Sequence, residues 1–352
     1  MDKTYCGEIM RRIYITTIIS MLISFSSAQK RGSFAGGFLR MGTSARAVAM
    51  GSAFTAEIDK GFAAYYNPAS LVHLKNSQAG FSNHFLMLDR QLMTINISMP
   101  LPPSAAIGVS WIGAGVDNID GRNTAGEHTK SLSTSENAYM VSFAQSMLPW
   151  LSVGLNVKVL RHQLPVNTMD LTGKGVGMDF GIFIKSKTGA NLALMIQDLN
   201  SRYQWKTDKI FERGKVYIEQ FPTLYRVGST FDYSDVYFTT DAGIVMIGGE
   251  VIDFSARLGA EYVYMDHYYL RGGFGNGRAI STLLARQGAK VFGTDINEEA
   301  GQNTCNFIKE EGNDFTFHKV NMTNEKEVNE FFLKIEKEHK KVDILVLSLI
   351  HI

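Results

Sequence analysis

The sequence predicts a mainly β fold, an antiparallel β-barrel, followed by a partial Rossmann-like α/β fragment. Between residues 77 and 275, apolar and polar side chains alternate with the period of two that is typical of strands. Several of these segments run for roughly 9–12 residues, the length that a tilted strand needs to cross a membrane. After about Gly277 the chain becomes rich in charged residues and in helix-forming stretches, so we expect a second unit there.

Composition argues against several classes of function. The chain of 352 residues has a formal net charge of +1, which gives no argument for nucleic-acid binding. Its two cysteines, Cys6 and Cys305, lie outside the alternating part, so no disulfide framework or cysteine-based metal site is expected there. His84, His128 and His162 lack the spacing of metal ligands. No Ser/His/Asp arrangement has motif support, and we predict neither a metal site nor catalytic residues.

The N-terminus has the features of an export signal. Arg11 and Arg12 precede a short apolar run over 13–25, and small residues follow it. The apolar run is shorter than the ~20 residues that a spanning helix needs, so a membrane anchor is the weaker alternative. We predict a signal peptide over 1–28, with Met10 as a possible true start.

Four segments show the predicted strands most clearly. They are 92–99, 152–159, 178–185 and 252–264. In the last of them, Ile252 and Leu258 share one face, while Arg257 and Glu261 share the other. A secreted β-sandwich is the alternative, although its strands usually run for about 5–6 residues. We expect about eleven strands, whereas bacterial single-chain barrels have even numbers, which suggests that C-terminal strands are missing.

Three motifs precede the first strand. They read Phe38-Leu39-Arg40-Met41-Gly42, Ala45-Arg46-Ala47-Val48-Ala49-Met50-Gly51-Ser52-Ala53 and Tyr65-Tyr66-Asn67-Pro68-Ala69-Ser70-Leu71. In this order they resemble the PorV/PorQ family, a branch of the outer-membrane barrel superfamily that includes the long-chain fatty-acid transporter FadL. The stretches 175–181, 198–207 and 257–262 also look like that family.

The resemblance implies a FadL-like outer-membrane barrel whose N-terminal segment lies in the lumen as a hatch. We place this hatch segment at 29–75 and the incomplete barrel at 76–277. The resemblance also implies the outer membrane of a Gram-negative bacterium as the location, with lipid around the barrel. It leaves two functions open: type IX secretion, with secretion-system components and cargo proteins as partners, or transport of hydrophobic small molecules.

Seven residues are candidates for the hatch and the lumen. They are Arg40, Arg46, Asn67, Pro68, Asp179, Arg257 and Glu261. Asn67 and Pro68 mark a turn. Arg40 and Arg46 are expected to meet lumen carboxylates, and the last three to form one lumen network. For Arg40 and Arg46 a structural ion pair is favoured over a role in transport. For the last three residues structural packing is favoured, because structural ion-pair networks perturb the charges of their members as functional sites do.

The C-terminal stretch alternates between helix and strand, which indicates a parallel α/β unit. The pattern predicts a helix opening at about Gly275, strands at 288–295 and 315–320 with a charged helix between them, a helix at 325–339 and a strand at 342–346. We place a partial Rossmann dehydrogenase fragment at 278–346.

This stretch looks like the first half of a short-chain dehydrogenase. The resemblance implies that Gly275 and Gly277 approach the cofactor pyrophosphate and that Asp295 bonds the adenosine ribose and favours NAD. Asn321 begins a segment that resembles the family's motif near adenine. No tyrosine follows Tyr269, so the family's catalytic tyrosine–lysine pair is absent. We therefore predict that the chain is not an enzyme and uses no cofactor; the alternative is a catalytically incomplete NAD-dependent short-chain dehydrogenase/reductase.

The last six residues suggest an origin for this combination. Residues 347–352 read Leu-Ser-Leu-Ile-His-Ile, which is what a transposon-end sequencing adapter encodes. We therefore expect an adapter-like tail on a chimera of two truncated genes. A genuine fusion protein is the alternative, although export and cytosolic NAD chemistry call for different compartments.

Overall fold

The computed structural model describes most of the chain between residues 34 and 339. The described ranges are 34–58, 61–86, 89–123, 125–166, 169–187, 189–208, 212–233, 235–264, 268–275, 281, 285, 288–296, 298–310, 312–321 and 324–339. The predicted signal peptide, Gly277, the strand expected at 342–346 and the tail at 347–352 lie outside these residues.

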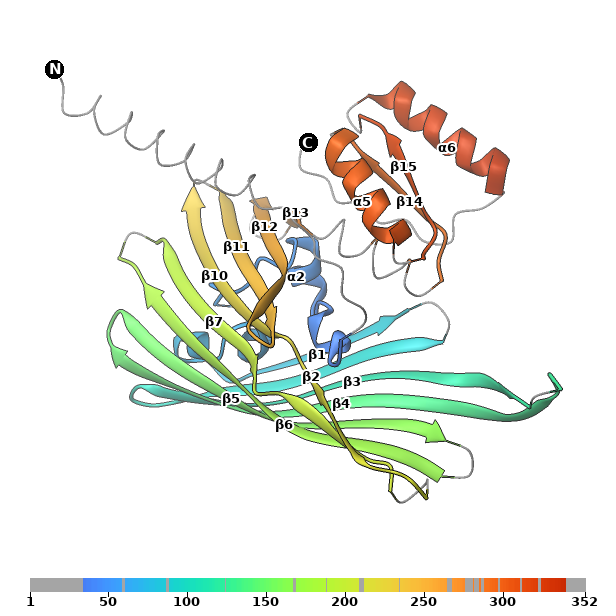
Figure 1. The fold of residues 1–352 in the computed structure, drawn as a ribbon. Helices are drawn as coiled ribbons and strands as arrows, with labels where there is room; N and C mark the ends of the chain where they lie inside the picture. The colour runs from blue at the N-terminus through green and yellow to red at the C-terminus, as the bar shows by residue number, and fades with distance from the viewer. Residues whose placement is uncertain are drawn as a thin grey trace.

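One antiparallel sheet of thirteen strands dominates the molecule, and we call it the wall (Figure 1). Its path is β1-β2-β3-β4-β5-β6-β7-β10-β11-β12-β13, while β8 pairs with β6 and β9 pairs with β8. The first strands are β1 Gln78–Phe85, β2 Arg90–Leu101, β3 Ala105–Arg122, β4 His128–Leu148, β5 Leu151–Val166, β6 Met169–Lys185 and β7 Asn191–Leu199. The later strands are β8 Arg202–Lys206, β9 Val216–Gln220, β10 Thr223–Tyr233, β11 Val236–Ile247, β12 Glu250–Tyr264 and β13 Tyr268–Phe274. The sheet has two strands more than the eleven or so expected from the sequence, and the short strands β8 and β9 lie off its main path.

The predicted alternation of side chains holds across neighbouring strands. One cross-strand row joins Ile97, Val109, Val141, Val157 and Met178, from β2 to β6. These five side chains face outward and are between 41% and 61% exposed. The adjacent row joins Ser98, Gly108, Ser142, Asn156 and Asp179, and these five residues are buried. The wall is therefore apolar outside and polar inside along this line.

The predicted alternation fails at one end of β12. Ile252 is buried and Val251 is exposed, although the sequence pattern placed Ile252 on the outward face with Leu258. The cause is a register shift between Val245 and Met246 on β11, where one strand carries an extra residue. Such a bulge reverses the faces of the residues beyond it.

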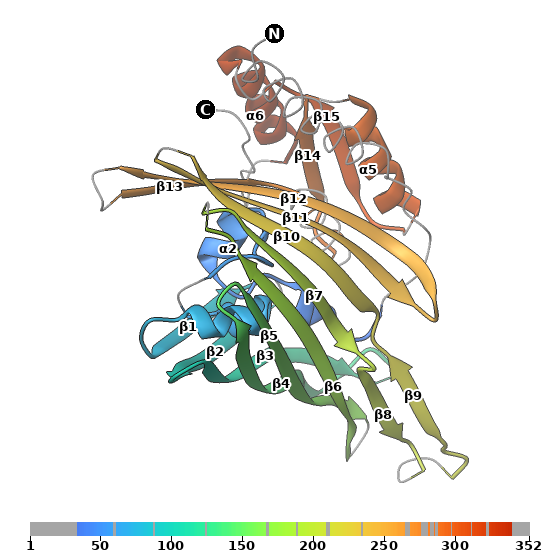
Figure 2. The same cartoon turned by 90° about the vertical axis from the view of Figure 1, so that its left-hand side faces the viewer.

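The hatch segment lies on the concave side of the wall (Figures 1 and 2). Its elements are η1 Gly37–Arg40, α2 Ala45–Ala49, α3 Ala63–Tyr66 and η2 Pro68–His73. Ser44 caps α2, because its side chain accepts a hydrogen bond from the Ala47 nitrogen. Among the helices of the described residues, none is long and apolar enough to cross a membrane.

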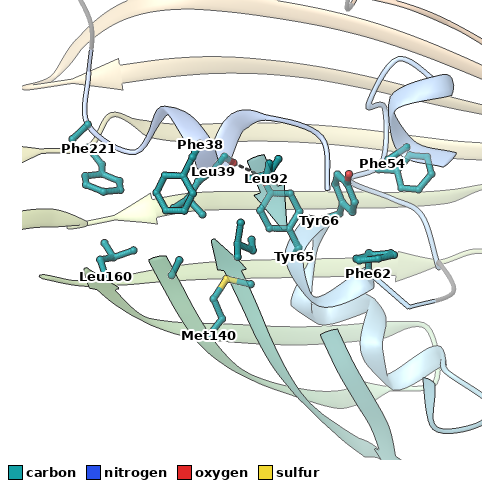
Figure 3. Packing of buried hydrophobic residues seen from close by; sticks show 14 of the residues in the cluster. Phe38, Leu39, Phe54, Phe62, Tyr65, Tyr66, Leu92, Met140, Leu160 and Phe221 are labelled. Atoms are coloured by element: carbon teal, nitrogen blue, oxygen red, sulfur yellow. Dashed lines mark hydrogen bonds between the residues drawn. The ribbon is translucent and has the colours of Figure 1, made fainter. Parts of the chain in front are cut away.

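An apolar cluster fills the space between the hatch segment and the wall (Figure 3). Its ten labelled members are Phe38, Leu39, Phe54, Phe62, Tyr65, Tyr66, Leu92, Met140, Leu160 and Phe221. The first six belong to the hatch segment. The Tyr65 and Tyr66 rings meet edge to face with their centres 4.9 Å apart, a favourable arrangement of two aromatic rings. The hatch segment is thus packed as a core element.

The C-terminal residues form a parallel β-α-β unit followed by a helix, as the sequence predicts. Its elements are β14 Val291–Asp295, α5 Glu298–Glu310, β15 Phe315–Lys319 and α6 Glu325–His339. The two strands pair in parallel with Val291 opposite Phe315. Cys305 and Ile308 of α5 pack with both residues in one buried cluster.

Candidate functional site

The hatch segment touches the wall at a pair of glycines. Gly154 on β5 and Gly181 on β6 are cross-strand partners. A Cβ atom at Gly154 would lie 2.4 Å from the Ala69 nitrogen, and one at Gly181 would lie 2.0 Å from Oδ1 of Asn67. A side chain does not fit, because non-bonded carbon atoms need about 3.5–4.0 Å. The glycines therefore let the turn at Asn67 and Pro68 lie directly on the wall.

The Asn67 side chain joins the hatch segment to two strands. Its Nδ2 donates to the carbonyl oxygens of Ile182 on β6 and Leu194 on β7, at 3.2 and 3.3 Å. It also donates to the Thr55 carbonyl at 3.1 Å, and Oδ1 accepts from the Ala69 nitrogen at 3.0 Å. Because Asn67 is fully buried, these bonds satisfy an amide that water cannot reach.

A second glycine pair receives the end of α2. Gly259 on β12 and Gly273 on β13 are cross-strand partners. A Cβ atom at Gly273 would lie 2.0 Å from the Gly51 nitrogen, and one at Gly259 would lie 2.5 Å from the Met50 carbonyl oxygen. The chain turns here with a φ of 67° at Gly51, a conformation that favours glycine. The hatch segment is therefore docked at two separate positions on the wall.

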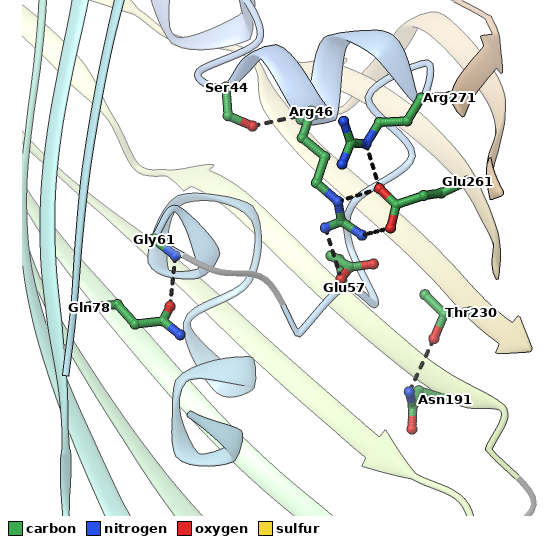
Figure 4. Close-up of polar contacts among 10 residues, drawn as sticks. Ser44, Arg46, Glu57, Gly61, Gln78, Asn191, Thr230, Glu261 and Arg271 are labelled. Atoms are coloured by element: carbon green, nitrogen blue, oxygen red, sulfur yellow. Dashed lines mark hydrogen bonds and ion pairs between the residues drawn. The ribbon is translucent and has the colours of Figure 1, made fainter. Parts of the chain in front are cut away.

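An ion-pair network connects α2 to β12 and β13 (Figure 4). Arg46 donates to both carboxylate oxygens of Glu261, from Nε at 2.9 Å and from Nη2 at 3.1 Å. Its Nη1 donates to Glu57 at 3.1 Å. Arg271 donates from Nε to the same Glu261 carboxylate. This forked arrangement fixes the orientation of the Arg46 side chain.

A second, deeper network lies on β5, β6 and β7. The Lys158 ammonium pairs with Asp179 at 2.6 Å and also with Asp198. Asp179 accepts a hydrogen bond from the Asp198 nitrogen at 2.8 Å and another from Asn156 at 3.0 Å. Asn156 in turn donates to the Ala64 carbonyl of the hatch segment at 2.9 Å. Lys158 therefore forms ion pairs with two buried carboxylates on neighbouring strands. Asn156 connects this network to α3.

Asp241 on β11 holds the loop that follows α2. Its carboxylate accepts from the backbone nitrogens of Phe54 and Thr55 at 3.1 and 3.2 Å. It also accepts from the Thr55 hydroxyl at 2.8 Å. Arg257 lies opposite Asp241 on β12 and donates weakly to the Ser52 carbonyl at 3.5 Å. The backbone nitrogens of the hatch loop therefore donate to the Asp241 carboxylate, which lies across from Arg257 on the neighbouring strand.

The predicted lumen residues divide between separate clusters. Arg46 meets Glu261, as expected for a hatch arginine and a lumen carboxylate. Asp179 pairs with Lys158 on β5, so the single network expected for Asp179, Arg257 and Glu261 is wrong. The alternation correctly placed Asp179 on the inner face, but its partner comes from the neighbouring strand.

Sequence reasoning missed three residues of this site: Lys158, Asp198 and Asp241. The sequence could have predicted Lys158, because its alternation places a lysine on the inner face in the middle of a strand, and a buried lysine needs a carboxylate partner. Asp198 and Asp241 were harder to predict, because the register between strands decides which groups a carboxylate contacts.

We expect His73 to make the stability of the protein depend on pH. Burial, with the charge of Lys185 as a smaller cause, lowers the pKa of His73 from 6.5 to about 4. The unfolded chain therefore binds a proton as the pH falls below 6.5, while the folded chain resists it until about 4. We expect the free energy of unfolding that His73 contributes to decrease across this window. Urea unfolding in detergent, compared between wild type and His73→Gln, measures this; parallel pH profiles would contradict it.

Three of the four candidate cofactor residues are described, and two of them, Asp295 and Asn321, lie at one edge of the C-terminal unit. Asp295 ends β14 and Asn321 follows β15, at the carboxyl ends of paired parallel strands. The Asp295 carbonyl accepts from the Val320 nitrogen at 3.2 Å, and the Asn321 nitrogen donates to Glu327 at 2.8 Å. Gly275 has a φ of 105° and is packed against β12, where a Cβ atom would lie 2.5 Å from the Ala256 carbonyl oxygen, so it does not join the other two residues. Polar groups at the carboxyl edge fit the adenosine part of a dinucleotide.

The C-terminal unit is similar in sequence to one protein family and to one relative. Residues 270–348 match a family model described as short chain dehydrogenase. Over 75 residues the chain is 39% identical to an uncharacterized oxidoreductase of Thermotoga maritima. That alignment covers 21% of this chain and 29% of the relative, so the chain spans less than a third of the relative's length.

The wall was compared with solved structures. A Pseudomonas aeruginosa FadL homologue is 11% identical, with 70% of this chain and 80% of that chain covered and a TM-score of 0.44. The Ralstonia pickettii toluene transporter TbuX is 14% identical, with 66% and 85% covered and a TM-score of 0.43. The Pseudomonas putida toluene transporter TodX is 12% identical, with 66% and 82% covered and a TM-score of 0.42. Because all three TM-scores are below 0.5, the fold is defined here by the strand pairing described above.

One sequence-based prediction requires correction. We expected that the chain is not an enzyme, because no tyrosine follows Tyr269. The match to a dehydrogenase family and the oxidoreductase relative contradict that expectation for the C-terminal part. The expectation considered only the catalytic pair, whereas the match covers β14, α5, β15 and α6.

Proposed function

We propose that the wall and the hatch segment form an outer-membrane transporter of hydrophobic small molecules. The observation that carries this proposal is the outward apolar row on β2 to β6, backed by a buried polar row. Soluble monomers seldom expose apolar patches of more than a few hundred Å². Lipid would cover this face, and pairing on both sides satisfies the backbone groups of β2 to β6 inside the membrane.

The apolar cluster inside the wall supports a hydrophobic substrate. Phe38 and Tyr65 of the hatch segment pack with Met140 and Leu160 of the wall in one cluster. A molecule passing between the hatch segment and the wall would meet these side chains. An apolar solute loses little free energy on entering such a lining, whereas a charged solute would lose its hydration.

Uptake of labelled toluene by cells that express the chain tests the transport function. We expect uptake several-fold above cells with an empty vector. Leu160→Trp, which fills the inner cluster, should return uptake to the background. Val157→Trp is the matched control, because it places the same residue on the outward face of the same strand, and its uptake should equal wild type. Background uptake by wild-type protein that is present in the outer membrane would contradict the proposal.

Type IX secretion is the second candidate for the exported part. The PorV/PorQ resemblance suggests it, and two long strands favour it. β3 and β4 contain 18 and 21 residues, whereas a membrane-crossing strand needs about 9–11. Their hairpin would therefore extend beyond the lipid and offer a surface to exported cargo proteins. Photo-cross-linking from Ala125 at the hairpin tip should capture secreted proteins; labelling of lipid or of no protein would contradict it.

For the C-terminal unit we propose NAD binding by an oxidoreductase. Bound NAD would supply hydride transfer. Asp295 would accept hydrogen bonds from the adenosine ribose, and Asn321 would lie beside the adenine. Glu327 holds the Asn321 backbone nitrogen and also accepts from the Asn324 side chain at 2.7 Å, which orients this edge.

Titration of the full chain in detergent with NAD tests that second proposal. We expect binding that Asp295→Ala weakens about tenfold or more, the usual loss for hydrogen bonds to a charged group. Asp314→Ala is the control, since Asp314 precedes β15 at the opposite edge. Equal affinity of the two variants would show that Asp295 does not contact the cofactor.

A further inference from the structure

Three exposed cations lie together on the outward face of β5, β6 and β8, and we call them the cationic patch. Arg161 on β5 lies opposite Lys174 on β6, and Lys174 lies opposite Gln204 on β8. Tyr203 is buried in the apolar cluster inside the wall, so Arg202 and Gln204 on either side of it face outward. Arg202 is therefore a diagonal neighbour of Lys174, about 7–8 Å away, which is within reach of long side chains.

The charges of the cationic patch are not balanced by neighbouring side chains. Among the described residues, no carboxylate forms an ion pair with Arg161, Lys174 or Arg202. Asp170, further along β6, accepts a hydrogen bond from Gln163 at 2.6 Å. The neighbours on this face are uncharged: Asn137, Gln163, Thr172, Gln204 and Gln220. Like charges directly opposite one another destabilise a sheet, so an anion beside Arg161 and Lys174 would be favourable.

The cationic patch lies where the outward face changes from apolar to polar. On one side of it, the adjacent cross-strand row joins Tyr139, Val159 and Val176, which are 50%, 54% and 61% exposed. On the other side, the adjacent row is polar and joins Ser135, Gln163 and Thr172. The pairing of β4, β5 and β6 has no register shift across these rows, so all of them share one face.

Aromatic side chains mark the same boundary. Trp111 lies opposite Tyr139 in the last apolar row, and its Nε1 donates to Asn137 of the next row at 3.0 Å. Tryptophan and tyrosine are enriched at membrane interfaces, where the ring meets lipid and the polar atom meets water. The large exposed apolar side chains of β4 lie between Tyr139 and Leu148, a span of about the 9–11 residues that a crossing strand needs. The cationic patch therefore begins where the apolar span ends.

We propose that Arg161, Lys174 and Arg202 bind the phosphate head group of an anionic membrane lipid. The acyl chains of that lipid would cover Val159 and Val176 in the adjacent apolar row. The guanidinium forks match pairs of phosphate oxygens, and the lysine adds a compact charge. Long cationic side chains lie along apolar surface while their charged ends stay at the level of the head groups. The inference rests on the proposed membrane location of the wall, and it assigns a site on the face that a transported solute would not use.

Native mass spectrometry of the full chain in nonionic detergent tests this site, with dioleoylphosphatidylglycerol and dioleoylphosphatidylcholine as probes. The two lipids share their acyl chains, but only the first has a net negative charge. At low ionic strength we expect wild type to bind phosphatidylglycerol more than tenfold more tightly. Arg161→Gln/Lys174→Gln should remove most of this preference, because each cation near an anionic lipid contributes about fivefold.

The matched control is Arg122→Gln/Lys319→Gln. It removes two exposed cations that are already paired, with Asp120 at 2.7 Å and with Glu298 at 3.1 Å. This variant has the same change in net charge, and its lipid preference should equal that of wild type. Arg161→Lys keeps the charge and should retain the preference. The replaced side chains are exposed, so the variants should fold, and heat-modified mobility on gels checks this.

Two results would overturn the lipid site: equal binding of the two lipids by wild type, or an unchanged preference in Arg161→Gln/Lys174→Gln. Saturable binding of inorganic phosphate that this variant loses would assign the cationic patch to soluble anions, and would overturn it as well. Toluene uptake is measured separately. Wild-type protein that takes up toluene but shows no lipid preference contradicts the lipid site alone, whereas a lipid preference without uptake contradicts the transport function alone.

Discussion

Lys158→Met should destabilise the protein by about 3–5 kcal/mol, the usual effect of removing one partner from a buried ion pair. Lys158 is the cation between Asp179 and Asp198, and all three side chains are at most 1% exposed. Without it, two carboxylates would remain buried beside one another. Urea unfolding of the detergent-solubilised protein measures the change in the free energy of unfolding.

Two further variants test the cause of that loss. Lys174→Met removes an exposed lysine from β6, and it should change stability by less than about 0.5 kcal/mol, as most surface substitutions do. Adding Asp198→Asn to Lys158→Met removes one of the stranded charges and should recover part of the loss. If the double variant is no more stable than Lys158→Met, the uncompensated charge is not the cause.

Gly181→Val should release the hatch segment while the wall stays folded. The added Cβ would lie 2.0 Å from Oδ1 of Asn67, so the turn cannot stay in place. Valine is favoured in strands, so β6 itself should tolerate the change. Trypsin should then cleave after Arg46, which in wild type is held by Glu57 and Glu261. Limited proteolysis followed by mass spectrometry measures this cleavage.

The matched control for this prediction is Gly115→Val. Gly115 lies on β3, and a Cβ atom there would meet only the Thr134 carbonyl oxygen, at 3.3 Å. We expect trypsin resistance like that of wild type. Equal protection of Arg46 in Gly181→Val and wild type would show that the glycine pair does not position the hatch segment.

The alternation of side chains made the wall predictable. In a strand, local sequence alone decides which face a residue occupies, and β2, β5 and β6 follow it. The two candidate strands of the C-terminal unit were likewise visible as short apolar runs before charged helices. Ile252 marks the limit, because its position depends on a bulge that forms against β11.

The contacts of the site were less predictable, because they join residues far apart in the sequence. Asn67 was recognised as a turn residue, yet its carbonyl partners lie on β6 and β7. The glycines at 154, 181, 259 and 273 were visible in the sequence. Their pairing into two docking positions depends on the strand register, which period-two alternation does not specify.

Cysteine labelling in lipid vesicles tests most directly whether the outward face of the wall lies in a membrane. The chain is reconstituted with single cysteines at Val141, Val157 or Ala125, in a Cys6→Ser/Cys305→Ser background, and treated with a membrane-impermeant maleimide. Val141 and Val157 are exposed on the outward face, while Ala125 lies at the β3–β4 hairpin tip. We expect rapid labelling at Ala125 and protection of Val141 and Val157 until detergent is added. Equal labelling at all three positions in intact vesicles would contradict a membrane-embedded wall.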